Sequence, residues 1–345
     1  MNDKKHNFSN DYSELAHPQV LQALAAATGQ FSGYGEDVYC QAAKDLIKQR
    51  CGEPASQADV HFVSGGTQAN LIVISSILRS HEAVVSTSLG HIYTNETGAI
   101  EATGHKVCAV PTVDGKLDAS KIDALFDEYD NEHHVRLKAV YVSQSTELGT
   151  VYTPDELAAL SAYCKNQGLY LFADGARLGS ALNSRAWGLD YADFAALVDV
   201  FYIGGTKNGA MYGEAIVITN DELKADFRYN IKQRGALLGK SAAMGIQFQA
   251  LFEDRLYDQL AQHANAMCQK LSEGITALGY KLFSPQQTNM IFPVFPTDIV
   301  SQMHALYDFY DREPVGDGFA VRLVTSWATP VEMVDQFLED LAELS

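Results

Sequence analysis

The sequence lacks several features that would mark a membrane, secreted or nucleic-acid-binding protein. No apolar run approaches the roughly 20 residues of a transmembrane helix, and residues 1–10 are polar, without the apolar core of a signal peptide. Positive charge is scarce, because 25 lysines and arginines face 43 aspartates and glutamates, for a formal net charge of −18. We therefore expect no membrane span, and no anionic membrane or nucleic acid as a partner.

Cysteine is also scarce and is not paired in the sequence. The chain has five cysteines, none of them in a CxxC pair: Cys40, Cys51, Cys108, Cys164 and Cys268. This usage predicts reduced thiols in a cytoplasmic protein and no metal site. The patterns around Cys108 and Cys164 favour small core residues over nucleophiles.

The chain is rich in apolar runs that alternate with helical patterns. With 345 residues, 47% of them hydrophobic, it can bury a large core. The alternation predicts an α/β fold with a large, mostly parallel sheet, whose sites lie at the carboxyl ends of the strands. Expected strands are 60–63, 83–86, 106–110, 139–143, 169–173, 200–203 and 215–218, and expected helices include 68–78, 119–129 and 153–165.

The pattern changes near Phe248. A long helical pattern runs to Leu278, and shorter strand and helix patterns follow it. We expect a large domain at 16–247, and a smaller α/β domain made of 1–15 and 248–345. The expected elements after the long helix are a strand at 288–295, a helix at 298–307, a strand at 319–325 and a helix at 330–344.

Two expected strands end in residues that carry chemistry. The run 169–173 is followed by Asp174-Gly175-Ala176-Arg177, and the run 200–203 by Gly204-Gly205-Thr206-Lys207. A carboxylate and a later lysine at strand ends are what an enzyme needs to hold pyridoxal 5′-phosphate (PLP). The lysine forms a Schiff base, and the acid keeps the ring nitrogen protonated. A structural aspartate is the alternative for Asp174.

Other residues near these strand ends fit the same cofactor. Gly66 and Thr67 lie where an expected strand turns into a helix, so their N–H groups and the helix dipole favour a phosphate. A purely structural turn is the alternative. The planar fork of Arg177 suits a substrate carboxylate, with a structural salt bridge as its alternative.

The order of these motifs resembles the threonine aldolase and aromatic amino acid β-eliminating lyase family of PLP-dependent enzymes, over nearly the whole chain. That family has the fold of aspartate aminotransferase. The segments that carry the resemblance are 8–11, 34–37, 66–70, His91, Glu96, 174–177, Lys207 and 321–325.

The resemblance implies roles for individual residues. Lys207 would be the Schiff-base lysine, and His91 would stack on the cofactor ring. Beyond the resemblance, His91 is our candidate for the base that removes the proton of the substrate's β-hydroxyl, directly or through a water molecule. The substrate carboxylate would be held by Ser9, Arg177 and Arg322. Tyr34 would line the entrance, from the neighbouring subunit of a homodimer or homotetramer whose active sites are shared.

The chain departs from the family pattern at two places. Lys240 stands where the family carries an arginine that helps to bind phosphate, and a lysine supplies a point charge instead of a fork. The segment 143–147 reads Ser-Gln-Ser-Thr-Glu and lacks a histidine that the family places near the β-hydroxyl. The residue that serves the substrate's β-substituent is therefore unassigned.

The expected activity is that of a PLP-dependent carbon–carbon lyase in amino acid metabolism. It would cleave the Cα–Cβ bond of a β-hydroxy-α-amino acid (threonine, allo-threonine or a phenylserine-like compound) to glycine and an aldehyde. A β-eliminating lyase or an aminotransferase on the same scaffold is the alternative, because a fold does not determine the reaction. A PLP-binding protein without enzymatic activity is a third reading.

Overall fold

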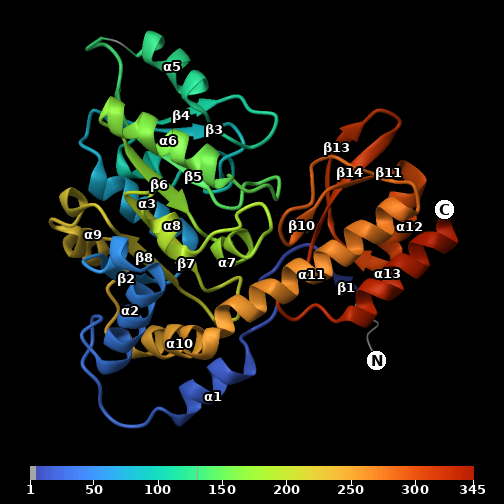
Figure 1. Ribbon diagram of the computed structural model, residues 1–345, viewed down its shortest axis with the longest axis horizontal. Helices are drawn as coiled ribbons and strands as arrows, with labels where there is room; N and C mark the ends of the chain where they lie inside the picture. Colours follow the sequence, from blue (N-terminus) through green and yellow to red (C-terminus); the bar gives the residue numbers. More distant parts are fainter. Residues whose placement is uncertain (1–4, 130) are drawn as a thin grey trace.

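The computed structural model describes residues 5–129 and 131–345. A large sheet with helices around it forms one part of the molecule, and the long helix α11 leads from it to a smaller sheet (Figure 1). The first described strand, β1, and the C-terminus lie beside the smaller sheet. Among the described residues, no helix combines the length and hydrophobicity that a membrane crossing requires.

The large sheet contains seven strands among the described residues, in the order β2-β8-β7-β6-β5-β3-β4. The five strands from β7 to β4 run parallel, and β8 is antiparallel to both of its neighbours, β7 and β2. The mostly parallel sheet predicted from the sequence is confirmed. The strands are β2 (Asp59–Val63), β3 (Glu82–Thr87), β4 (Val107–Val110), β5 (Arg136–Ser143), β6 (Tyr170–Asp174), β7 (Val200–Gly204) and β8 (Glu214–Ile218).

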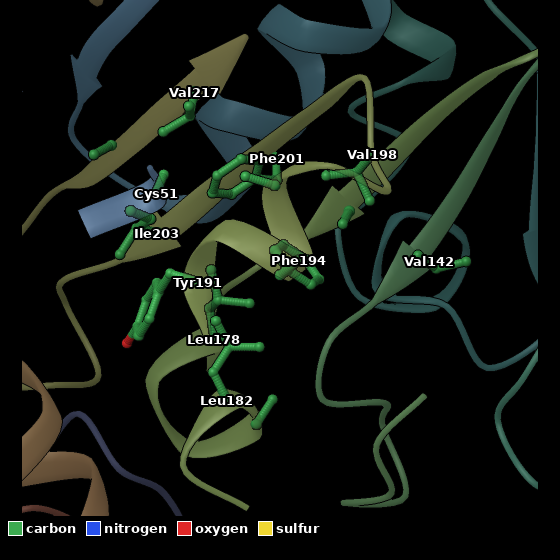
Figure 2. Close-up of a cluster of buried hydrophobic side chains, with 14 of the residues drawn as sticks. Cys51, Val142, Leu178, Leu182, Tyr191, Phe194, Val198, Phe201, Ile203 and Val217 are labelled. Atoms are coloured by element: carbon green, nitrogen blue, oxygen red, sulfur yellow. The ribbon is translucent and has the colours of Figure 1, made fainter. Parts of the chain in front are cut away.

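Side chains that alternate along these strands fill two cores, one on each face of the sheet. On one face Phe201, Ile203 and Val217 pack against α7, α8 and α2 (Figure 2). The same core extends to α1, α6 and α10. The helices with residues in this core are α1 (Pro18–Ala26), α2 (Val38–Cys51), α5 (Ala119–Glu128), α6 (Pro154–Gln167), α7 (Leu178–Leu182), α8 (Tyr191–Ala195), α10 (Ala242–Phe252) and α11 (Leu256–Ala277).

The opposite face of the sheet carries Tyr141, Phe172 and Tyr202, which pack against α3 (Gly66–Ile77) and α9 (Phe227–Gln233). Helix α4 (His91–Thr94) follows β3. Because side chains alternate in direction along a strand, Asp174 and Glu214 share this face with the two tyrosines. Short 3₁₀ turns complete this part of the chain: η1 (Glu53–Ala55), η2 (Glu101–Thr103), η3 (Asp221–Leu223) and η4 (Glu253–Arg255).

The smaller sheet has a core of its own, to which Phe8 from the N-terminal segment belongs. Strands β10, β14, β11 and β9 follow one another in it, and β13 pairs with β14. The division into a large domain (16–247) and a small domain (1–15 and 248–345) stays a prediction. Residues 1–4 of the predicted small domain lie outside the described part of the chain. The elements are β1 (His6–Asn7), β9 (Lys281–Leu282), β10 (Met290–Ile291), β11 (Pro293–Pro296), α12 (Thr297–Leu306), β12 (Tyr307–Asp308), β13 (Tyr310–Val315), β14 (Gly318–Val324) and α13 (Val331–Leu344).

The long helix predicted from Phe248 to Leu278 is not continuous. Helix α10 ends at Phe252, and α11 begins at Leu256. Between them Asp254 and Arg255 adopt φ angles of 50° and 59°, a left-handed conformation that a helix cannot contain. No glycine or proline marks this break, so the apolar period alone could not reveal it.

Candidate active site

A cavity of about 300 Å³ opens at the edge of the large sheet where β6 and β7 end. Six of the sequence-predicted site residues line it: Gly66, Thr67, His91, Asp174, Arg177 and Lys207. They come from four separate parts of the chain, which the parallel sheet brings to a single edge. The cavity is also lined by Tyr12, Ser143, Glu147, Tyr202 and Glu214.

Asp174 is buried and accepts four hydrogen bonds. The hydroxyls of Tyr202 and Tyr141 each donate to it at 2.5 Å, the backbone N–H of Ala176 at 2.9 Å, and Nδ2 of Asn70 at 3.1 Å. Burial opposes the ionised form, but the two tyrosine hydroxyls, the charge of His91 and the Ala176 N–H together outweigh it and lower the pKa of Asp174. Asp174 is therefore a carboxylate at neutral pH.

A chain of polar contacts joins Asp174 to His91. Asn70 Nδ2 also donates to Glu96 Oε1 at 2.7 Å, and the same oxygen lies 2.8 Å from Nδ1 of His91. Glu96 is buried, so it fixes one edge of the imidazole from inside the protein. The other ring nitrogen, Nε2, remains for contacts in the cavity.

Glu147 holds the backbone of His91. Its Oε1 accepts the His91 N–H at 2.9 Å and the hydroxyl of Ser143 at 2.6 Å. Burial raises the pKa of Glu147. His91 is thus fixed by two carboxylates, one at its ring and one at its main chain.

Lys207 extends from the turn after β7 into the cavity. Burial and the neighbouring charge of Arg177 lower its pKa, which favours the neutral amine that acts as a nucleophile. Glu214 is a second acid near this amine. Burial raises the pKa of Glu214, while the Lys207 charge opposes that rise, and its Oε2 accepts the N–H of Gly205 at 2.9 Å.

Arg177 forms a two-point pair with Asp11. Its Nε and Nη2 donate to the two carboxylate oxygens at 2.6 and 3.0 Å. Asp11 is buried and also accepts Nδ2 of Asn289 at 2.9 Å. The salt bridge that the sequence left open as an alternative is thus present, and Nη1 is the guanidinium nitrogen outside it.

Arg322 and Ser9 contact each other at the small sheet. Nη2 of Arg322 donates to the Ser9 carbonyl at 2.8 Å, and its guanidinium lies 4.9 Å from the ring centre of Tyr310. Burial and the charge of Arg177 lower the pKa of Arg322. Its Nε is buried, with no hydrogen-bond acceptor among the described residues, and such a donor favours an anionic ligand.

Tyr34 and Lys240 do not line the cavity. They lie on two loops that are bonded to each other, since the Tyr34 N–H donates to the Leu238 carbonyl at 3.0 Å and the Gly35 N–H to Ser241 Oγ at 2.7 Å. Tyr34 is 47% exposed and Lys240 is exposed. Within one chain, the structure therefore does not bring these two sequence-predicted residues to the others.

The turn from β2 into α3 borders the cavity with Gly65, Gly66 and Thr67. Gly65 caps the helix with an extended backbone, and no side chain bonds to the first turn. The first N–H groups of α3 are therefore available to a ligand, at the positive end of a 12-residue helix.

The sequence reasoning missed four residues of this site: Tyr141, Tyr202, Glu147 and Glu214. The two tyrosines stand inside apolar runs and resemble ordinary core residues. Each lies two residues before the end of its strand and faces the same side as Asp174, and that spacing is the signal that could have identified them.

Comparisons with known proteins agree with this fold. The chain is 32% identical to the low specificity L-threonine aldolase of Pseudomonas aeruginosa, over 99% of this chain and 98% of the relative. It is similar to a solved threonine aldolase structure from Leishmania major, with 48% identity, a TM-score of 0.95 and coverage of 98% and 99% of the two chains.

A more distant likeness concerns the fold alone. An aspartate aminotransferase structure from Thermus thermophilus is 17% identical, with a TM-score of 0.71, over 100% of this chain and 92% of that one. The predicted fold class is therefore confirmed. The family model described as "Beta-eliminating lyase" matches residues 14–297, and the chain belongs to that family, as the resemblance in its sequence indicated.

Proposed function

We propose that the cavity binds pyridoxal 5′-phosphate through Lys207. The residues fit this cofactor: a buried, ionised Asp174 suits a protonated pyridine nitrogen, and a lysine with a lowered pKa suits the aldehyde. The free N–H groups at the start of α3 suit the phosphate. The convergence of Lys207, Asp174 and the α3 turn in one cavity is the observation that carries the proposal.

The surrounding side chains would hold the rest of the cofactor and the substrate. We propose that His91 lies on the cofactor ring and exchanges a proton with the substrate, directly or through a water molecule. Arg177, Arg322 and Ser9 would hold the substrate carboxylate. The buried Nε of Arg322 and the Nη1 of Arg177 are the donors that support this assignment.

The reaction we propose is cleavage of a β-hydroxy-α-amino acid, such as threonine, allo-threonine or a phenylserine-like compound, to glycine and an aldehyde. When bound, PLP withdraws electrons from Cα of an amino acid attached to it. The two arginines fix the carboxylate and so orient the Cα–Cβ bond, and such orientation contributes up to ~7–11 kcal/mol to a reaction step. Lys207 would return the proton to Cα of glycine.

The two loops that carry Tyr34 and Lys240 are proposed to act in a second copy of the chain. Lys240 is exposed and lies outside the cavity of its own chain, and a cation near a cofactor phosphate would complete the neighbouring site. A homodimer or homotetramer with shared active sites accommodates this arrangement. The cytoplasmic location remains a prediction from the sequence.

β-Elimination is the second candidate, because the matching family model carries that reaction in its description. The two reactions differ in their products: an aldolase forms glycine and an aldehyde, and an eliminating lyase forms a keto acid and ammonia. Incubation of the holoenzyme with threonine and with phenylserine, followed by amino acid analysis, tests the proposal. We expect glycine in equal amount to the aldehyde. A keto acid with ammonia would contradict the proposed reaction.

A further inference from the structure

Glu147 is a half-buried acid that the proposed binding of cofactor and carboxylate does not use. It lies in the segment after β5 and lines the cavity together with His91 and Lys207. Its Oε1 is occupied by two donors, the His91 N–H and the Ser143 hydroxyl. Its Oε2 accepts no hydrogen bond from any described residue, so one oxygen of a cavity carboxylate is left for a ligand.

The segment that carries Glu147 is held in place from several sides. The Thr146 N–H donates to the Thr150 carbonyl at 2.9 Å, and the hydroxyls of these two threonines lie 2.7 Å apart. The Ser284 hydroxyl donates to the Leu148 carbonyl at 2.9 Å. A carboxylate on such a fixed turn has a defined position, which a group that must meet one substrate atom requires.

The chemistry of the free oxygen selects its ligand. A carboxylate oxygen accepts hydrogen bonds only, so the ligand must donate one. The substrate carboxylate is excluded as this ligand because it is negatively charged and donates no hydrogen bond. The amino group on Cα is excluded because it would be bonded to the cofactor. The β-hydroxyl is the remaining donor of a β-hydroxy-α-amino acid.

We propose that Glu147 is a catalytic residue that binds the β-hydroxyl of the substrate and accepts its proton as the Cα–Cβ bond breaks; this inference rests on the proposed function. The O–H bond breaks and its proton passes to Oε2 of Glu147. The electron pair of the O–H bond forms the aldehyde C=O, and the pair of the Cα–Cβ bond stays with Cα. Glu147 thus takes, in place of His91, the proton of the β-hydroxyl. His91 keeps its place on the cofactor ring, with Nδ1 2.8 Å from Oε1 of Glu96.

Two further observations agree with this role. Burial raises the pKa of Glu147, and a base is more effective when its pKa lies closer to the working pH. His91 is engaged by carboxylates at its ring Nδ1 and its backbone, which suits a ring that holds one orientation.

Glu147→Gln tests the proposal because glutamine keeps an oxygen acceptor for His91 and Ser143 but cannot take a proton. Two reactions of the purified holoenzyme are compared: threonine cleavage, and exchange of the α-hydrogen of glycine in deuterated water, which involves no β-hydroxyl. Removal of a general base typically costs about 10²–10⁴-fold in rate, so we expect a fall of that size in cleavage and a change below about threefold in exchange. Glu101→Gln, at an exposed glutamate of η2, is the matched control.

Three results would overturn the inference. Cleavage by Glu147→Gln within about threefold of wild type would show that no proton passes to this residue. An equal loss of cleavage and exchange would show a structural role only. Absence of glycine from every β-hydroxy amino acid with the wild-type enzyme, while glycine exchange persists, would remove the proposed function itself and the inference with it.

Discussion

The hydroxyl of Tyr202 on β7 donates to Oδ1 of Asp174 on the neighbouring strand β6 at 2.5 Å. Tyr141 on β5 donates to the other oxygen from the opposite side. These two phenols satisfy a carboxylate that is buried at the bottom of the cavity, and they keep it ionised. The strand order β5-β6-β7 is what places all three side chains next to one another.

Tyr202→Phe should therefore destabilise the protein. It removes one of the two donors to Oδ1 of a buried carboxylate and leaves only the Ala176 N–H there, and a hydrogen bond to a charged group contributes about 1.5–3 kcal/mol. Urea unfolding of the cofactor-free protein at pH 7 measures the loss in the free energy of unfolding. Tyr229→Phe, at a tyrosine that is 78% exposed, is the control. Equal stability of the two variants would contradict the account of Asp174.

Asp11→Asn should cost more, because it leaves the largely buried charge of Arg177, whose side chain is 16% exposed, without its partner. Breaking a buried pair in this way destabilises a protein by about 3–5 kcal/mol. Urea unfolding at neutral pH would detect it, with the exposed Asp317→Asn as the control. A loss below about 1 kcal/mol would place the pair among exposed salt bridges, which contribute little.

The destabilisation caused by Asp11→Asn should change with pH in one direction only. Burial opposes ionisation of Asp11, but Arg177, Lys207 and the donated hydrogen bonds lower its pKa below the ordinary 3.8. The stabilising contribution is therefore present above pH 3.8 and is lost as the pH falls through the lower, folded-state pKa. The gap in unfolding free energy between wild type and Asp11→Asn should stay constant at neutral pH and shrink below pH 3.8. A gap that widens on acidification would contradict this assignment.

Gly175→Ala should disrupt the junction between β6 and β7. A Cβ at Gly175 would lie 1.7 Å from the Tyr202 carbonyl oxygen, which is backbone and cannot turn away. We expect a loss of more than about 3 kcal/mol, beyond the usual range for overpacking. Gly239→Ala is the matched control, since a Cβ there meets nothing within 4 Å. Equal melting temperatures of the two variants would show that β6 and β7 can move apart at this point without loss of stability.

Lys240→Ala tests whether this lysine acts in a second copy of the chain. We expect weaker binding of PLP, measured by equilibrium dialysis, because a cation near the phosphate is lost. Mixed oligomers of Lys240→Ala with Lys207→Ala should regain sites that carry neither change. At limiting PLP they should form more glycine than Lys207→Ala, which forms none, and than Lys240→Ala, which binds PLP weakly. Failure of the mixture to exceed the separate variants would place Lys240 in its own subunit's site or outside any site.

Much of the fold could be predicted because, in most helices and strands, the local sequence pattern favours the same structure as the packing does. The helix expected at 153–165 is present as α6, and Thr153 begins it with a capping box that includes Glu156. The strands of the large sheet were predicted within a few residues, since they are buried on both faces and appear as continuous apolar runs. The break at Asp254 was missed because ordinary residues adopt the left-handed conformation there.

The site was predictable where a residue type has few uses, as with Lys207 and Asp174 at strand ends. Tyr141 and Tyr202 were missed because a tyrosine in an apolar run packs in the core of most proteins. Here the two rings pack in the core, and their hydroxyls also donate hydrogen bonds to Asp174. Asp11 was known only as a marker of the family. Its pairing with Arg177 joins positions 166 residues apart, and no local pattern specifies such a contact.

The proposed function depends on the covalent attachment of PLP to Lys207, which mass spectrometry can locate. The purified protein is incubated with PLP, reduced with borohydride, digested and analysed by mass spectrometry. The account predicts one phosphopyridoxyl group, on the peptide that contains Lys207, and no such group in Lys207→Ala. A label on another lysine, or none at all, would contradict the account.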